Sequence, residues 1–168
     1  WVSSVSTIRY AVLGSVFYQY LDEDWRIWTT NGEANQKEEI LYEYLSDTLD
    51  LLLSRGIQPV VFAPPPTTGQ DIGGCLVKAT LFGDSLMNCD FMLQDHKELN
   101  SKVVQLLERL DRDYRVIWTD DALCQQATCS ASIDGVFVYR DDFHFSYEGS
   151  AYVGQVMDVS DLLTSRND

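Results

Sequence analysis

The chain has 168 residues, of which 45% are hydrophobic and 23% are charged, a balance that favours one globular domain with a sizeable core. Its formal net charge of −14 disfavours nucleic acid as a partner, because an acidic surface repels the phosphate backbone. No apolar run approaches the roughly 18–20 residues of a membrane-spanning helix, and from the abrupt start at Trp1 we expect a piece of a longer protein.

The first half of the chain predicts two strands around a long helix. Residues 7–13 are apolar and β-branched and predict a strand that ends at Gly14, before a polar and aromatic connector. From about residue 36 to 55, apolar residues recur at three- and four-residue steps, which predicts a helix that Gly56 terminates. The run Val60–Ala63 predicts a short buried strand, which the three following prolines end.

The second half predicts shorter elements. They are, in chain order, a Gly-rich loop at 67–74, a helix at about 95–110, a strand at 115–118, a loop with Cys124 and Cys129, a brief strand at 136–138, and a helix capped by Ser146 that runs to about Leu163. This alternation predicts an α/β fold with a mostly parallel sheet covered on both faces, in a single domain over residues 1–168.

The four cysteines, Cys75, Cys89, Cys124 and Cys129, fit two disulfides paired by proximity, Cys75–Cys89 and Cys124–Cys129. Zinc is the alternative, since the spacing of the second pair suits a metal site. The first pair is widely spaced and has no nearby histidine pair, so we favour disulfides, and with them an oxidising compartment. We expect no metal and no cofactor.

Two segments suggest a serine hydrolase. Residues 81–91 read LFGDSLMNCDF and place Ser85 in the Gly-Asp-Ser-Leu sequence that opens one class of serine esterases. Residues 139–150 read YRDDFHFSYEGS and place Asp141 three residues before His144. A serine needs a base to take its proton, and the base needs a carboxylate to orient it. A histidine that only packs at a helix start is the alternative, and Asp142 is a rival carboxylate.

The second segment resembles the last block of the SGNH hydrolases, and more narrowly of the SGNH domains fused to the C-terminus of integral-membrane acyltransferases that O-acetylate bacterial surface polysaccharides such as lipopolysaccharide O-antigen. The resemblance covers nearly the whole chain and rests on that block together with YAVLGSVFYQY, VVFAPPP, Cys75-Leu76, Cys89 and the pair Cys124 and Cys129. It implies a three-layer α/β/α fold, SGNH- or flavodoxin-like, that is incomplete at its N-terminus.

The resemblance also implies a division of roles. Asp141 and His144 would be catalytic, and the nucleophilic serine would lie upstream of Trp1, because that block opens the family's domain. Ser85 would then lie in a loop between two paired cysteines, and the segment LMNCDF after it has no helical period, with the next helix at about Asp95. The family's Asn block is missing, so Gly14 or Ser15 is the candidate oxyanion donor.

The function that follows is transfer of an acetyl group to a hydroxyl of a bacterial surface polysaccharide. The expected partners are that polysaccharide and a transmembrane acyltransferase domain of the same protein, and the expected location is periplasmic, tethered to the inner membrane. The alternatives are a carbohydrate acetylesterase with Ser85 as nucleophile and a non-catalytic glycan-binding or docking module. An aromatic segment could stack on sugars or pack under a loop; it comprises Phe17, Tyr18, Tyr20, Trp25 and Trp28.

Overall fold

The computed structural model describes residues 7–22, 24, 26–30, 32–33 and 37–159. The chain forms two compact units, and it passes between them three times. Unit 1 comprises Trp1–Ala63 and Asn100–Ile117, and unit 2 comprises Pro64–Leu99 and Trp118–Asp168. The prediction of a single domain over the whole chain stays a prediction.

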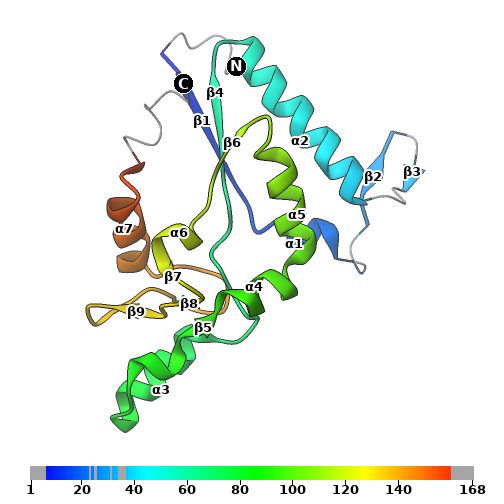
Figure 1. The fold of residues 1–168 in the computed structure, drawn as a ribbon. Helices are drawn as coiled ribbons and strands as arrows, with labels where there is room; N and C mark the ends of the chain where they lie inside the picture. The colour runs from blue at the N-terminus through cyan, green and yellow to red at the C-terminus, as the bar shows by residue number, and fades with distance from the viewer. Residues whose placement is uncertain (1–6, 23, 25, 31, 34–36, 160–168) are drawn as a thin grey trace. The chain divides into compact units, whose positions relative to one another are not determined.

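Unit 1 is built on a parallel sheet of three strands in the order β1-β4-β6 (Figure 1). The strands are β1 (Tyr10–Gly14), β4 (Gln58–Phe62) and β6 (Arg115–Ile117). Gly14 is paired with Phe62, and Phe62 with Ile117, so all three strands end at the same edge of the sheet. Helix α2 (Lys37–Ser54) packs on β4, and α5 (Ser101–Leu110) packs on β6 and on α2. The predicted α/β fold with a mostly parallel sheet is therefore confirmed.

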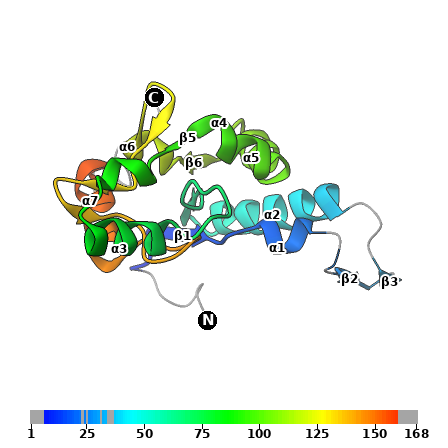
Figure 2. The same ribbon diagram turned by 90° about the horizontal axis from the view of Figure 1, so that it is seen from below.

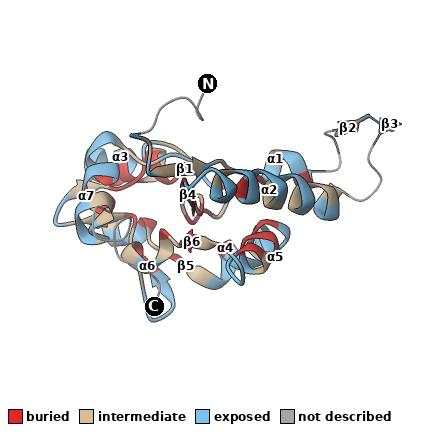
Figure 3. Cartoon of the chain, turned by 90° about the horizontal axis from the view of Figure 1, so that it is seen from above, coloured by how far each residue is buried: buried red, intermediate tan, exposed pale blue. Residues whose placement is uncertain are grey.

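The helices of unit 1 differ in how much they bury. Helix α5 buries one face, formed by Val103, Leu106, Leu107 and Leu110, whereas Leu49 is the residue that α2 buries fully (Figure 3). Gly56 ends α2 as predicted: its φ of 72° lies in the left-handed region, and the N–H of Ile57 reaches back to the carbonyl of Leu52.

The connector of unit 1 contains more structure than the sequence predicted. It holds α1 (Tyr18–Leu21) and a small antiparallel pair, β2 (Trp28–Thr29) and β3 (Gly32–Glu33). Figures 1 and 2 both show this pair next to the amino-terminal end of α2.

Unit 2 contains short helices and antiparallel strand pairs. Its elements are α3 (Ile72–Phe82), the 3-10 helix η2 (Leu86–Cys89), β5 (Phe91–Met92), α4 (Leu93–Leu99), α6 (Asp120–Leu123), β7 (Cys124–Gln125), β8 (Thr128–Cys129), β9 (Ser132–Ile133), β10 (Val136–Phe137) and α7 (Tyr147–Val156). Strands β5, β8 and β7 form one sheet, and β9 and β10 form a hairpin. The sequence predicted a loop where β7 and β8 pair, and it predicted α7 to continue beyond its observed end; Leu163 lies outside the described residues.

Two disulfides stabilise unit 2. They join Cys75 to Cys89 and Cys124 to Cys129, the pairing that proximity in sequence favours. Because all four thiols are consumed, the zinc alternative is wrong. Cys89 and Cys129 lie inside the hydrophobic core of this unit, whose other members are Ile72, Leu76, Ala79, Phe91, Leu123, Ala131, Val138, Tyr139 and Val153. The disulfides therefore hold α3 and the β7–β8 hairpin against one small core.

Helix α3 corrects the predicted loop at 67–74, because the loop ends at Asp71. The Asp71 carboxylate accepts a hydrogen bond from the N–H of Gly74 and caps the helix. The sequence did not predict this cap. The two glycines in the first turn favour a loop by sequence. In the structure Gly73 is buried where the chain around Arg140 passes close by, so a side chain at Gly73 would meet the Arg140 carbonyl.

The predicted helix at 95–110 is two helices, α4 and α5, separated at Asn100, where φ is −107° and ψ is 26°. Leu99, which was expected on the buried face, is 57% exposed. The two helices bury different kinds of residue in different units: α4 buries His96 in unit 2, and α5 buries its apolar face in unit 1.

Candidate active site

The candidate site lies on the loop between β10 and α7 in unit 2. Tyr139 and Phe145 form an isolated antiparallel bridge, and the N–H of Arg140 donates to the carbonyl of His144, so the two arms of the loop are paired. Ser146 ends the loop and caps α7, as predicted, by accepting a hydrogen bond from the N–H of Gly149. The loop is thus anchored at both ends, which leaves its tip to present Asp141 and His144.

Asp141 and His144 form a hydrogen-bonded pair. Nδ1 of His144 lies 3.0 Å from each carboxylate oxygen of Asp141. A carboxylate only accepts hydrogen bonds, so Nδ1 must carry the ring's proton, and a neutral ring then has its lone pair on Nε2. The His144 side chain is 58% exposed, so this lone pair is accessible to a reacting group. This is the arrangement that a general base requires.

Asp141 is held as a carboxylate. Its Oδ1 accepts from the backbone N–H groups of Phe143 and His144, at 2.9 and 2.8 Å, and its Oδ2 accepts from the Arg140 guanidinium at 3.2 Å. Partial desolvation raises the pKa of Asp141, but these hydrogen bonds and the one to the His144 ring outweigh it, and the pKa lies well below its ordinary value. Within the described part of the chain, the Asp142 carboxylate makes no such bond to His144; instead the Asp142 backbone carbonyl accepts from Thr67.

Three residues that the sequence analysis did not consider support this loop. Tyr139 is 1% exposed and its hydroxyl donates to the carbonyl of Pro66 at 2.8 Å, while its ring packs against Phe91 and Phe145. Thr67 Oγ1 donates to the Asp142 carbonyl. Gly73 allows α3 to lie directly against the loop. Of these three residues, only Tyr139 had a signal in the sequence, because it is the first residue of the segment YRDDFHFSYEGS that carries the family resemblance.

His96, the second histidine, is buried beneath the Thr67 segment. It is 8% exposed, and its Nδ1 accepts a hydrogen bond from the N–H of Thr67 at 3.0 Å. Burial is the main cause that lowers the pKa of His96, although the Thr67 backbone and the charge of Asp120 act in the opposite direction. His96 is therefore a buried residue that supports the fold of unit 2.

The other predicted site residues lie elsewhere. Ser85 is exposed at the start of η2, directly after Gly83 ends α3, so a short 3-10 helix follows it where the sequence predicted no helix before about Asp95. Among the described residues, no hydrogen bond joins Ser85 to His144. Gly14 and Ser15 belong to unit 1, at and just beyond the carboxyl end of β1. The roles of these three residues stay predictions.

The aromatic segment is divided between core and surface. Phe17 is 4% exposed, whereas Trp28 is 70% exposed and Tyr18 and Tyr20 are partly so; Trp25 lies outside the described residues. Only part of the segment is therefore free to contact a sugar.

The part of the chain that the structure describes contains neither a cluster of metal ligands nor a membrane-spanning helix. There, no three His, Cys, Asp or Glu side chains gather as metal ligands would. None of the described helices combines the length and the apolar character needed to cross a bilayer.

Comparison with known proteins identifies the family of this chain. The model of the SGNH domain (fused to AT3 domains) matches residues 1–158. The chain is similar to the periplasmic domain of a lipopolysaccharide acetyltransferase from Salmonella ser. Paratyphi A, with a TM-score of 0.59, 14% identity and 92% of this chain covered. The match spans 57% of that domain, and at this identity it shows the fold alone. No curated protein sequence matches. Since the family model covers nearly all of the chain, the chain belongs to the SGNH domains that are fused to AT3 domains.

Proposed function

We propose that this domain takes part in moving an acetyl group onto a hydroxyl of a bacterial surface polysaccharide. The observation that carries the proposal is the Asp141–His144 pair, in which a carboxylate fixes Nδ1–H and leaves Nε2 at the surface. Membership in a family fused to AT3 domains supports acyl transfer, and the similar Salmonella domain belongs to a lipopolysaccharide acetyltransferase.

The chemistry would run in two steps. In the first, Nε2 of His144 takes the proton of a serine hydroxyl as the serine oxygen bonds to the acetyl carbonyl carbon; the donor's leaving group departs with that proton, and an acetyl-serine remains. In the second, Nε2 takes the proton of a glycan hydroxyl, whose oxygen attacks the acetyl-serine and releases the serine, which regains a proton from His144. Asp141 stabilises the imidazolium in both steps.

The serine and the oxyanion donors complete the proposal. The serine is the one that the family resemblance places upstream of Trp1, and Gly14 and Ser15 are the candidate donors to the developing negative charge. An AT3 portion of the same protein would deliver the acetyl group across the membrane. The location would be periplasmic, which agrees with the two disulfides.

A fluorophosphonate probe, which reacts with activated serines, tests the proposal. It is applied to this chain and to a version extended upstream through the family's nucleophile block. We expect labelling of the extended version alone, lost in His144→Ala. Labelling of the 168-residue chain that disappears in Ser85→Ala would instead establish Ser85 as the nucleophile, as in an acetylesterase. No labelling of either version would contradict the enzymatic proposal and favour a binding module.

A further inference from the structure

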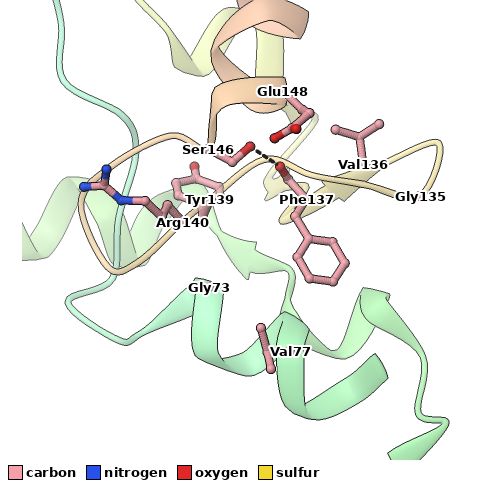
Figure 4. Close-up of a pocket in the computed structure, with 9 residues that line it drawn as sticks. All are labelled: Gly73, Val77, Gly135, Val136, Phe137, Tyr139, Arg140, Ser146 and Glu148. Carbon is pink, nitrogen blue, oxygen red and sulfur yellow. Dashed lines mark hydrogen bonds between the residues drawn. The ribbon is translucent and has the colours of Figure 1, made fainter. Parts of the chain in front are cut away.

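A pocket of about 520 Å³ lies in unit 2 beside the loop that carries the Asp141–His144 pair (Figure 4). Its lining comes from α3, the β9–β10 hairpin, the first part of the loop between β10 and α7, and the start of α7, and comprises Gly73, Val77, Gly135, Val136, Phe137, Tyr139, Arg140, Ser146 and Glu148. Its volume is in the range of about 300–1,000 Å³ that small-molecule sites occupy.

One wall of the pocket is apolar and includes an aromatic ring. Figure 4 shows the Phe137 side chain extending from β10 toward α3, where Val77 and Gly73 lie. Val77 is 50% exposed, so its side chain contributes little to the core and is available to a ligand. Gly73 lies with its backbone directly against the chain at Arg140, which forms the floor beside this wall. An aromatic ring and a valine with open space between them offer a surface for a flat apolar face.

Most polar groups at the rim of the pocket already make hydrogen bonds within the protein. The Tyr139 hydroxyl donates to Pro66, and the Ser146 hydroxyl donates to the carbonyl of Phe137. In Figure 4 the Arg140 guanidinium points away from the apolar wall, and it binds Asp141. Glu148 is exposed at the rim, where its carboxylate can accept hydrogen bonds from a ligand. The pocket thus combines an apolar wall with an acceptor at its edge.

We infer that this pocket binds a neutral pyranose ring of the acceptor glycan, an inference that rests on the proposed function. The apolar face of a pyranose matches the Phe137 and Val77 wall, and its hydroxyls can donate to Glu148. An anionic ligand would be repelled by Glu148, since Arg140 is already neutralised by Asp141. An acyl chain would be poorly covered in an open pocket with a half-exposed valine.

The position of Arg140 connects this pocket to the chemistry. Arg140 lines the pocket edge, and its Nε and Nη2 lie 3.2 Å from the Asp141 carboxylate that is hydrogen-bonded to His144. A sugar bound in the pocket would therefore lie beside the loop between β10 and α7 that carries Asp141 and His144.

The test is a binding measurement that needs no nucleophile. The 168-residue chain is titrated with glucose, galactose, mannose, rhamnose and N-acetylglucosamine, and separately with hexanoate, while the NMR signals of Val77, Val136 and Phe137 are followed. We expect at least one pyranose to shift these signals, and Val77→Gln and Phe137→Ala each to weaken that response about tenfold. Val156→Gln is the matched control, because Val156 is also a helical valine and is 52% exposed, and it should leave the response unchanged.

Several outcomes would overturn the inference. They are the absence of any pocket response to the pyranoses, a response that Val77→Gln leaves intact, a pocket response to hexanoate alone, and shifts confined to the aromatic residues of unit 1. Because Val77 is half exposed, Val77→Gln should stay folded even if Phe137→Ala does not.

The outcomes are independent of those for the proposed function. In an acetyl-transfer assay with an acceptor polysaccharide, Val77→Gln should raise the KM for the acceptor about tenfold and leave kcat nearly unchanged. Sugar binding without any acetyl transfer would retain the pocket and refute the transferase. Transfer with an unaltered KM in Val77→Gln would retain the transferase and refute the pocket.

Discussion

The two histidines of this chain show how surroundings assign a role to the same side chain. His144 faces solvent at 58% exposure, and its Nδ1 donates to the Asp141 carboxylate. His96 is 8% exposed, and its Nδ1 accepts from the backbone N–H of Thr67. Nδ1 of His144 thus faces a carboxylate, whereas Nδ1 of His96 lies against the Thr67 backbone, 3.0 Å from its nitrogen and 3.2 Å from its carbonyl oxygen.

The difference decides what each ring can do. A ring with a free lone pair at the surface and a carboxylate behind it can take a proton and be stabilised as a cation. A buried ring pays a desolvation cost when it is protonated, and this cost is the main cause of the lowered pKa of His96. The loop with Asp141 and His144 is therefore suited to chemistry, and the region around His96 and Thr67 to holding that loop in place.

Replacement of His144 by alanine tests the first half of this comparison and should have the largest effect. In the upstream-extended version, we expect the rate of fluorophosphonate labelling to fall by at least about 10⁴-fold, because the proposed general base is removed. The exposed side chain contributes little to packing, so the free energy of unfolding should change by less than about 1 kcal/mol. A large loss of stability would mean that His144 is structural after all.

Asp141→Asn should have the next largest effect. The amide can donate to Nδ1 and so favours the wrong tautomer, while its oxygen can still accept the backbone N–H groups of Phe143 and His144; the labelling rate should fall about 10²- to 10⁴-fold. Asp142→Asn is the matched control, because Asp142 supports the loop through its backbone carbonyl. If Asp142→Asn were the more harmful change, Asp142 would be the orienting carboxylate.

His96→Ala tests the second half of the comparison through stability. It would leave the buried N–H of Thr67 without its acceptor and create a cavity, which should cost about 2 kcal/mol of unfolding free energy in denaturant titrations. His96→Asn retains an acceptor and should recover part of that loss. Equal destabilisation by the two variants would show that the hydrogen bond contributes nothing.

The smallest expected effect is on the pH dependence of the free energy of unfolding, in which His96 and Asp141 should contribute over different pH ranges. The pKa of His96 is lower in the folded chain than its ordinary value of 6.5, so the unfolded chain binds a proton that the folded chain does not, and stability should fall as the pH drops below about 6.5. The lowered pKa of Asp141 adds stability that is present above its ordinary value of 3.8 and is lost below it. Unfolding measured from pH 8 to 3 should show both declines. His96→Asn should remove only the first.

The sequence was most informative where local chemistry dominates. The strands of the parallel sheet were predicted within a few residues, because short apolar runs between turn residues have few alternatives. The same is true of the helix stop at Gly56 and the cap at Ser146. Both depend on one backbone conformation or one side chain close in sequence.

The sequence was misleading where distant contacts override local signals. Gly73 and Gly74 suggested a loop, but the Asp71 cap, the disulfide from Cys75 and the burial of Leu76 make this segment a helix. Likewise, the brief strand predicted at 136–138 is β10, but its partner β9 was not predicted, although Asp134 and Gly135, with φ of 51° and 79°, are the turn residues that such a hairpin requires.

The sequence by itself determined that the Asp141 carboxylate stands three residues before His144, a spacing that lets one short turn join the two side chains. It also determined that both lie in a segment that resembles the last block of the SGNH hydrolases. Only the tertiary structure decided that this ring is exposed, that the other histidine is buried, and that Tyr139, Thr67 and Gly73 hold the loop. The physical reason is that exposure and support depend on which distant segments fill the space around a residue, and spacing along the chain does not carry that information.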